Sequence, residues 1–145
     1  MTTMPTGLTA DAGWQIGVSR TLPQPPDIVW GHLTGAAGLA CWLGPGADPT
    51  FAPGAQYRTD AGVTGEIRSY RPGERIRLTY GQTTVQVTLT PAAGHRTRVR
   101  FHQERMSSAA QREQRRAHWQ QVMDELAAAL DALRPGSAGG DLDTR

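Results

Sequence analysis

Lysine is absent from this sequence, cysteine occurs once, and aromatic residues make up only 6% of the chain. All 15 basic residues are therefore arginines, and against 13 acidic residues they leave a formal net charge of +2. Without lysine the glycine-rich turns cannot form a phosphate-binding loop of the Walker type. A charge of +2 is too small to indicate a nucleic-acid partner.

The single cysteine excludes an internal disulfide bond and is typical of a protein from a reducing compartment. Cys41 lies in the apolar run GLACWL, which favours a small buried side chain over a reactive thiol. The first residues lack the basic start and apolar stretch of a signal peptide. No run approaches the roughly 18 apolar residues of a membrane-spanning helix. We therefore expect a cytoplasmic protein with no membrane partner.

Metal and nucleophile motifs are also missing. The four histidines and Cys41 are scattered, with neither a C-x-x-C motif nor a histidine pair spaced i, i+4. No G-x-S-x-G elbow presents a serine nucleophile. The sequence predicts no metal site and no cofactor.

A chain of 145 residues suits one domain. We expect a flexible arm over residues 1–12, a single domain over 13–134 and a disordered tail over 135–145. Alternating apolar residues predict a first strand over 14–22. Pro25 and Pro26 then introduce a short helix over 27–33, and a second follows over 36–42. Turn residues dominate 44–54, where a very short strand near Thr50 is compatible with the pattern.

Five further strands are predicted over 56–59, 63–70, 75–80, 83–90 and 97–104. Short turns separate them, so neighbouring strands must run antiparallel. Their arginines, at 75, 77, 98 and 100, are expected to face water. The opposite, apolar face is predicted to consist of Ile76, Leu78, Tyr80, Val85, Val87, Leu89, Val99 and Phe101.

The last predicted element is a long helix that begins after Ser107 or Ser108 and ends at Leu133, before Pro135. Its buried stripe is predicted to comprise Trp119, Val122, Met123, Leu126, Leu130 and Leu133. These elements give an α+β fold, with a sheet of six to seven antiparallel strands, two short helices after the first strand and one long C-terminal helix.

Three segments carry a family resemblance. PPDIVWGHLT with LACWLGP, GAQYR with GVTGEIRSYRPGERIRLTY, and FHQERMSSAAQREQRRAHWQQVMDELAAAL are similar, in this order, to segments of the START-like (SRPBCC, birch-pollen-allergen-like) superfamily. The branch that they resemble is named after the activator of the heat-shock-protein ATPase. The resemblance implies a helix-grip fold, in which a curved sheet wraps round the long helix and leaves a cavity between them.

Candidate functional residues lie around that implied cavity. His102, His118 and Tyr80 are the candidates for acid–base chemistry, the two histidines near one mouth of the cavity; the alternative is two exposed histidines and a half-buried tyrosine. Trp42 and Trp119 are candidates both for lining the cavity and for filling the core. An arginine cluster at 105, 112, 115 and 116 is suited to bind a carboxylate or phosphate, or forms a solvated helix face. The predicted ligand-binding set is Trp42, Trp119, Met123, Tyr57, Tyr70, Phe101, Arg112 and Arg115.

Two classes of function fit these observations. The first is binding of a hydrophobic molecule, aromatic or polyketide-like, by a cyclase or aromatase or by a self-resistance protein that sequesters a metabolite. The second is a protein-interaction or stress-response role resembling that of a co-chaperone, without a small ligand. In either case we expect a monomer or a weak homodimer.

Overall fold

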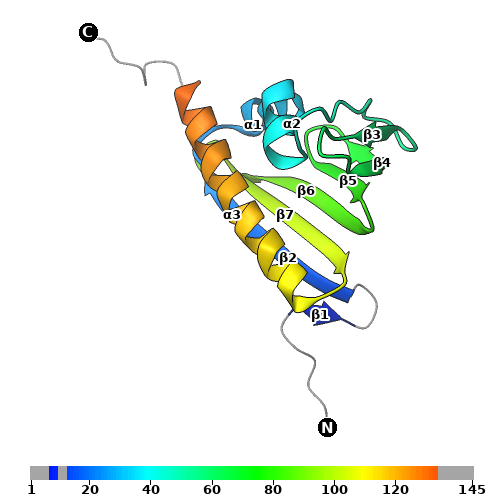
Figure 1. Ribbon diagram of the computed structural model, residues 1–145. Coiled ribbons are helices and arrows are strands. Elements are labelled where there is room, and N and C mark those ends of the chain that lie inside the picture. Colours follow the sequence, from blue (N-terminus) through cyan, green and yellow to red (C-terminus); the bar gives the residue numbers. More distant parts are fainter. Residues whose placement is uncertain (1–6, 10–12, 134–145) are drawn as a thin grey trace.

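A computed structural model describes residues 7–9 and 13–133 of the chain (Figure 1). The elements are, in chain order, β1 (Leu8–Thr9), β2 (Gly13–Leu22), α1 (Pro26–Thr34), α2 (Ala36–Trp42), β3 (Gln56–Arg58), β4 (Thr64–Arg71), β5 (Arg75–Tyr80), β6 (Thr83–Ala92), β7 (Arg96–Met106) and α3 (Ala109–Ala132).

All seven strands form one antiparallel sheet in the order β1-β2-β7-β6-β5-β4-β3. Strands β3 to β7 form a meander, and β2 then pairs with β7. Helix α3 runs along β2 and β7, while α1 and α2 lie beside its C-terminal half (Figure 1). This arrangement confirms the predicted α+β helix-grip fold.

Local sequence signals explain where the helices begin. Pro26 occupies the first position of α1, where its missing N–H costs no helical hydrogen bond. Gly35 separates α1 from α2. Ser108 caps α3, its hydroxyl accepting a hydrogen bond from the Gln111 backbone N–H at 3.0 Å. The tight β5–β6 turn places Gly81 at φ +59°, a conformation that glycine adopts without strain.

Seven of the eight residues predicted for the inner face of the sheet are buried, each with at most 4% of its surface exposed. Val122, Leu126 and Leu130 of α3 close the core from the other side. Tyr80 is only half-buried at the end of β5. The buried, inward-facing strand residues are Ile76, Leu78, Val85, Val87, Leu89, Val99 and Phe101.

Two predictions about local structure were wrong. No strand forms near Thr50; the described residues 44–55 are turns and irregular backbone, because glycine and proline interrupt the segment. Leu133 does not belong to the buried stripe, since 61% of it is exposed. It follows the last residue of α3 and borders an open groove along α1 and the start of α2.

The predicted arm and tail fall largely outside the described residues: 1–6, 10–12 and 135–145 are not described. Within the arm, Leu8–Thr9 form β1 and pair with Gly13 and Trp14 of β2, which the sequence pattern did not predict. Among the described helices, none combines the length and the apolar character needed to cross a membrane.

Candidate functional site

A pocket of about 480 Å³ opens between the β5–β6 turn and the first turns of α3. Strand β7 supplies its floor, and the segment before β4 supplies one wall. Ligand pockets in proteins commonly have volumes of this size. The pocket is lined by Val63, Tyr80, Gly81, Gln82, Thr83, Gln103, Arg105, Ser107, Gln111 and Arg115.

A buried glutamine organises the floor of the pocket. Only 1% of Gln103 is exposed, and its amide oxygen accepts hydrogen bonds from Arg115 Nε at 2.7 Å and from Trp119 Nε1 at 2.9 Å. Its amide nitrogen donates to the Thr83 hydroxyl at 2.9 Å. Gln103 thus fixes side chains from α3 and β6 at once, and every bond it makes is largely withdrawn from water.

Arg115 crosses from α3 to the pocket between two aromatic rings. The central guanidinium carbon lies 4.8 Å from the centroid of the Tyr80 ring and 5.2 Å from that of Trp119. Both distances are within the range of cation–π attraction. Burial lowers the pKa of Arg115, an effect that Tyr80 opposes. The geometry presents a half-buried positive charge at the edge of the pocket.

Deeper than the pocket, three aromatic rings fill the space between sheet and helix. Trp119 stacks on Phe101 with centroids 4.7 Å apart, and Trp42 approaches the same ring at 6.3 Å. Trp42 Nε1 donates to the Leu33 carbonyl at 2.9 Å. These rings and Met123 are at most 1% exposed and do not line the pocket. Of the two alternatives for the tryptophans, the structure places both in the core.

The other predicted tyrosines lie in different surroundings. Tyr57 is buried, and its hydroxyl donates to the Thr79 carbonyl at 2.5 Å; burial raises its pKa. A side chain on Gly65 would collide with this hydroxyl, so the glycine lets Tyr57 cross β4. Tyr70 stacks on Phe51 at 5.2 Å and does not line the pocket.

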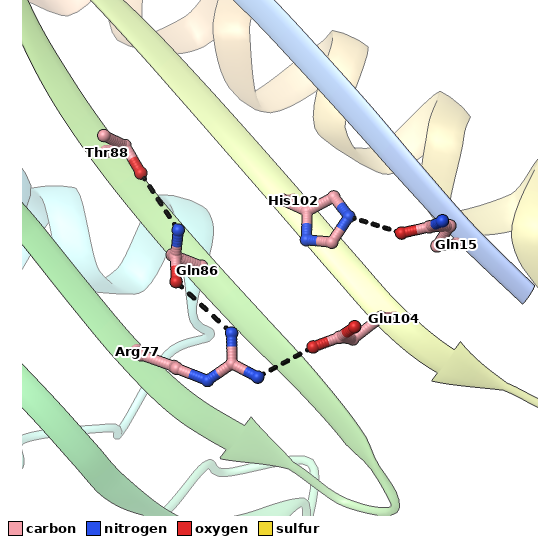
Figure 2. A network of polar contacts seen from close by, with 6 residues as sticks. All are labelled: Gln15, Arg77, Gln86, Thr88, His102 and Glu104. Carbon is pink, nitrogen blue, oxygen red and sulfur yellow. Dashed lines mark hydrogen bonds and ion pairs between the residues drawn. The ribbon is translucent and has the colours of Figure 1, made fainter. Parts of the chain in front are cut away.

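The two histidines lie on opposite sides of the sheet. His102 is on the outer face, where Nε2 lies 2.8 Å from Gln15 Oε1, near the ion pair of Arg77 with Glu104 at 2.8 Å (Figure 2). His118 is on α3, with its ring edge-on to Trp119 at 4.6 Å. Neither lines the pocket. His102 follows the inward-facing Phe101, so the alternation of the strand directs it outward.

Burial lowers the pKa of both histidines, to about 4 for His118. Both are half-buried, so the alternative of two exposed histidines does not describe them. Within residues 7–9 and 13–133, no three histidine, cysteine or acidic side chains gather in a way suited to a metal ion.

In the described part of the chain, two members of the arginine cluster pair with a carboxylate and two do not. Arg112 Nε donates to the Gln15 carbonyl at 2.7 Å, and its terminal nitrogen pairs with Glu113 at 2.7 Å. Arg116 also pairs with Glu113, at 3.7 Å. Arg105 and Arg115 line the pocket instead.

Cys41 is half-buried rather than buried as predicted, and its surroundings are not purely apolar. Its thiol lies 3.4 Å from a carboxylate oxygen of Glu125. Burial, together with this carboxylate, raises the pKa of the thiol to about 11, which disfavours the reactive thiolate.

Sequence reasoning missed Gln103 and Thr83, the two polar residues of the pocket floor. A signal for Gln103 was present, because it shares strand parity with Val99 and Phe101 and therefore points inward. A polar residue on an apolar strand face requires a hydrogen-bond partner inside the protein. That requirement predicts a buried polar cluster but does not name its partners.

Solved structures with the same architecture include MLL2253 from Mesorhizobium loti, which is 23% identical over 83% of this chain and 99% of its own, with a TM-score of 0.72. CalU16 from Micromonospora echinospora is 19% identical over 84% of this chain and 80% of its own, with a TM-score of 0.69. DynU16, a protein of the dynemicin biosynthetic locus, is 24% identical over 83% of this chain but only 48% of its own, with a TM-score of 0.68. At these identities the likeness shows the fold.

The search of curated proteins gives no match. A family model described as "Activator of Hsp90 ATPase homolog 1-like protein" matches residues 23–131, from the residues before α1 to the last turn of α3. That span contains α1, α2, all of α3 but its last residue, and five of the seven strands. It also contains every residue that lines the pocket. The chain therefore belongs to the family of Activator of Hsp90 ATPase homolog 1-like proteins, as the three sequence segments indicated.

Proposed function

We propose that this protein binds a small, largely apolar molecule with a planar ring system in the pocket between the β5–β6 turn and α3. The observation that carries the proposal is the arrangement of Tyr80, Arg115 and Gln103 around a space of about 480 Å³. Such sites combine an apolar body with a few fixed polar groups that orient the ligand.

The pocket supports binding better than turnover. A cyclase or aromatase needs a group that moves protons within hydrogen-bond reach of its substrate. No histidine, aspartate or glutamate is among the described residues that line the pocket. The two histidine candidates lie elsewhere. Tyr80 is the one acid–base candidate that lines the pocket, and no histidine or carboxylate among the described lining residues can exchange a proton with its hydroxyl. We therefore favour sequestration or delivery of a metabolite over its chemical conversion.

Two observations suggest the chemical class of the ligand: the residues at the edge of the pocket and a solved structure of similar fold. An aromatic or polyketide-like molecule suits a pocket edged by a tyrosine ring and a guanidinium plane, because both stack on flat π-systems. DynU16, which shares the fold, is a protein of the dynemicin biosynthetic locus. This supports, for the present chain, a role in a natural-product pathway as a binding or self-resistance protein.

The test is a titration of the protein with a panel of planar aromatic compounds. Binding is detected as a change in tryptophan fluorescence and in melting temperature. Val63 lines the pocket, so Val63→Trp should fill it and abolish binding. Thr21→Trp places the same side chain at an exposed position of β2 and should leave binding intact. If no compound changes either signal of the unmodified protein, the proposal fails.

A protein-interaction role is the second candidate, and one feature favours it. Ile28 and Leu133 are the two large hydrophobic side chains of the described chain that are exposed, at 46% and 61%. Both border a groove of about 470 Å³ along α1 and the start of α2. Failure of the titration, combined with binding to a partner protein that Ile28→Ser abolishes, would support this role.

A further inference from the structure

The charged residues that line the pocket are all positive. Its ten lining residues include two arginines, Arg105 and Arg115, and no aspartate or glutamate. In the part of the chain that the structure describes, neither arginine has a carboxylate within 4.0 Å. Their neighbours Arg112 and Arg116 both pair with Glu113. Of the four arginines at 105, 112, 115 and 116, the two without a carboxylate partner in the described part of the chain are thus the two that line the pocket.

Arg115 is held as a preformed receptor. Its Nε is fixed by Gln103, and its central guanidinium carbon lies over the rings of Tyr80 and Trp119. The bond to Gln103 involves an amide rather than a carboxylate, so the positive charge is not neutralised. A partly buried guanidinium interacts more strongly with an anion than one in open water, because the surrounding dielectric constant is lower. Its forked geometry also matches a carboxylate.

Arg105 adds a second cation in an unusual backbone conformation. Its φ is +68°, in the left-handed region that favours glycine. The residue lies where the pairing of β2 with β7 shifts register, between the pairs Trp14–Met106 and Ile16–Gln103. An arginine at a position that glycine would occupy with less strain is explained if its side chain has a task there.

We infer that the ligand carries an acid group, a carboxylate or a phenolate, and that Arg115 and Arg105 bind it. This inference rests on the proposed function and names the chemical class of its ligand: a planar aromatic anion. Arg115 supplies the fixed charge beside the pocket floor, and Arg105 supplies the charge at the rim.

The experiment compares 2-naphthoic acid with the neutral, similarly shaped 2-naphthamide by calorimetric titration of the full chain at pH 7.5. We expect the acid to bind on the order of 10-fold more tightly, as charge-assisted hydrogen bonds are stronger than neutral ones. Raising the salt concentration should weaken binding of the acid and leave that of the amide nearly unchanged.

Variants then assign the preference to the two arginines. Arg115→Gln and Arg105→Gly should each remove most of the preference for the acid, whereas Arg105→Lys should keep it. Arg116→Ala is the matched control on α3 and should behave as the unmodified protein. Because glycine suits a positive φ, Arg105→Gly should fold with an equal or higher melting temperature, so a loss of binding cannot be ascribed to unfolding.

The outcomes separate the two proposals. Equal binding of acid and amide, blocked by Val63→Trp, would overturn the acid-binding inference and leave the proposed function standing. A preference for the acid that survives both Arg115→Gln and Arg105→Gly would also overturn the inference. Absence of any binding, here and across the panel of aromatics, would overturn both.

Discussion

Trp119 of α3 lies almost flat on Phe101 of β7, with ring planes inclined by 14° and centroids 4.7 Å apart. The two residues come from the elements that enclose the interior, and both are at most 1% exposed. Their contact closes the space between sheet and helix at the middle of α3. It therefore separates a Leu-rich packed end from the pocket at the first turns of the helix.

The first prediction concerns how much this stacked pair contributes to stability. Trp119→Ala should lower the free energy of unfolding by about 3–5 kcal/mol, because it leaves a cavity and removes the indole N–H from Gln103. Trp119→Phe keeps the ring contact and loses only the polar bond, so its cost should be clearly smaller. Urea denaturation measures both. Equal losses would mean that the hydrogen bond, rather than packing of the rings, dominates the contribution of Trp119.

A second prediction compares two leucines of the same helix region. Leu126 is 2% exposed, whereas Leu133 is 61% exposed. Leu126→Ala should cost about 2–5 kcal/mol of unfolding free energy, and Leu133→Ala about 0.5 kcal/mol or less. The substitution is the same, so differences in helix propensity are small. Similar denaturation midpoints for the two variants would contradict the exposed position of Leu133.

Gln103 is the subject of the third prediction. Gln103→Leu would leave Arg115 Nε and the buried Trp119 Nε1 without their acceptor, and should cost about 1–3 kcal/mol for each group that stays unsatisfied. Gln103→Glu retains an acceptor for both groups and adds a negative charge beside Arg115. It should be less destabilising than Gln103→Leu in denaturant melts at neutral pH. The reverse order of stability would show that the cluster contributes little.

The same pair of variants reports on the ligand. Because Gln103→Glu gives Arg115 a carboxylate partner, we expect it to weaken binding of an aromatic acid more than binding of the matching amide. Calorimetric titration measures this difference. A variant that retains the full preference for the acid would show that Arg115 does not bind the acid group.

The fourth prediction concerns pH. Burial, reinforced by the charge of Arg115, lowers the pKa of His118 to about 4, whereas an unfolded histidine titrates near 6.5. Between these values the unfolded chain binds more protons than the folded one. His118 therefore favours unfolding progressively as the pH falls from about 6.5 to about 4. Above pH 6.5 both states carry a neutral ring, and this contribution disappears.

His118→Gln should consequently lose less stability between pH 7.5 and pH 4.5 than the unmodified protein does. Urea denaturation at the two pH values gives the four free energies needed. His102, whose pKa is also lowered by burial, accounts for part of the remaining decline. Parallel declines for variant and unmodified protein would show that His118 is not buried as described.

The sequence alone determined the architecture, because local chemistry suffices to specify it. Strand alternation placed Val85, Val87 and Phe101 on one face, and tight turns imposed antiparallel pairing. The serine pair 107–108 marked the start of α3, where the structure shows that Ser108 is the cap. The spacing of apolar residues also identified Val122 and Leu126 as buried, since one face of a helix repeats every three or four residues. It did not reveal that Leu133 is exposed, because the pattern carries no information on where the partner surface ends.

Only the tertiary structure determined which residues line the pocket and which fill the core. Whether Trp119 lines a cavity or fills the core depends on Phe101, 18 positions earlier in the chain, and on the curvature that brings β7 against α3. Arg112 and Arg115 look equivalent in the sequence, yet one is bound by Glu113 and the backbone of β2 and the other faces the pocket. Side-chain partners that are distant in the chain are set by packing of the whole fold, so no local pattern could assign the charge of the pocket to Arg105 and Arg115.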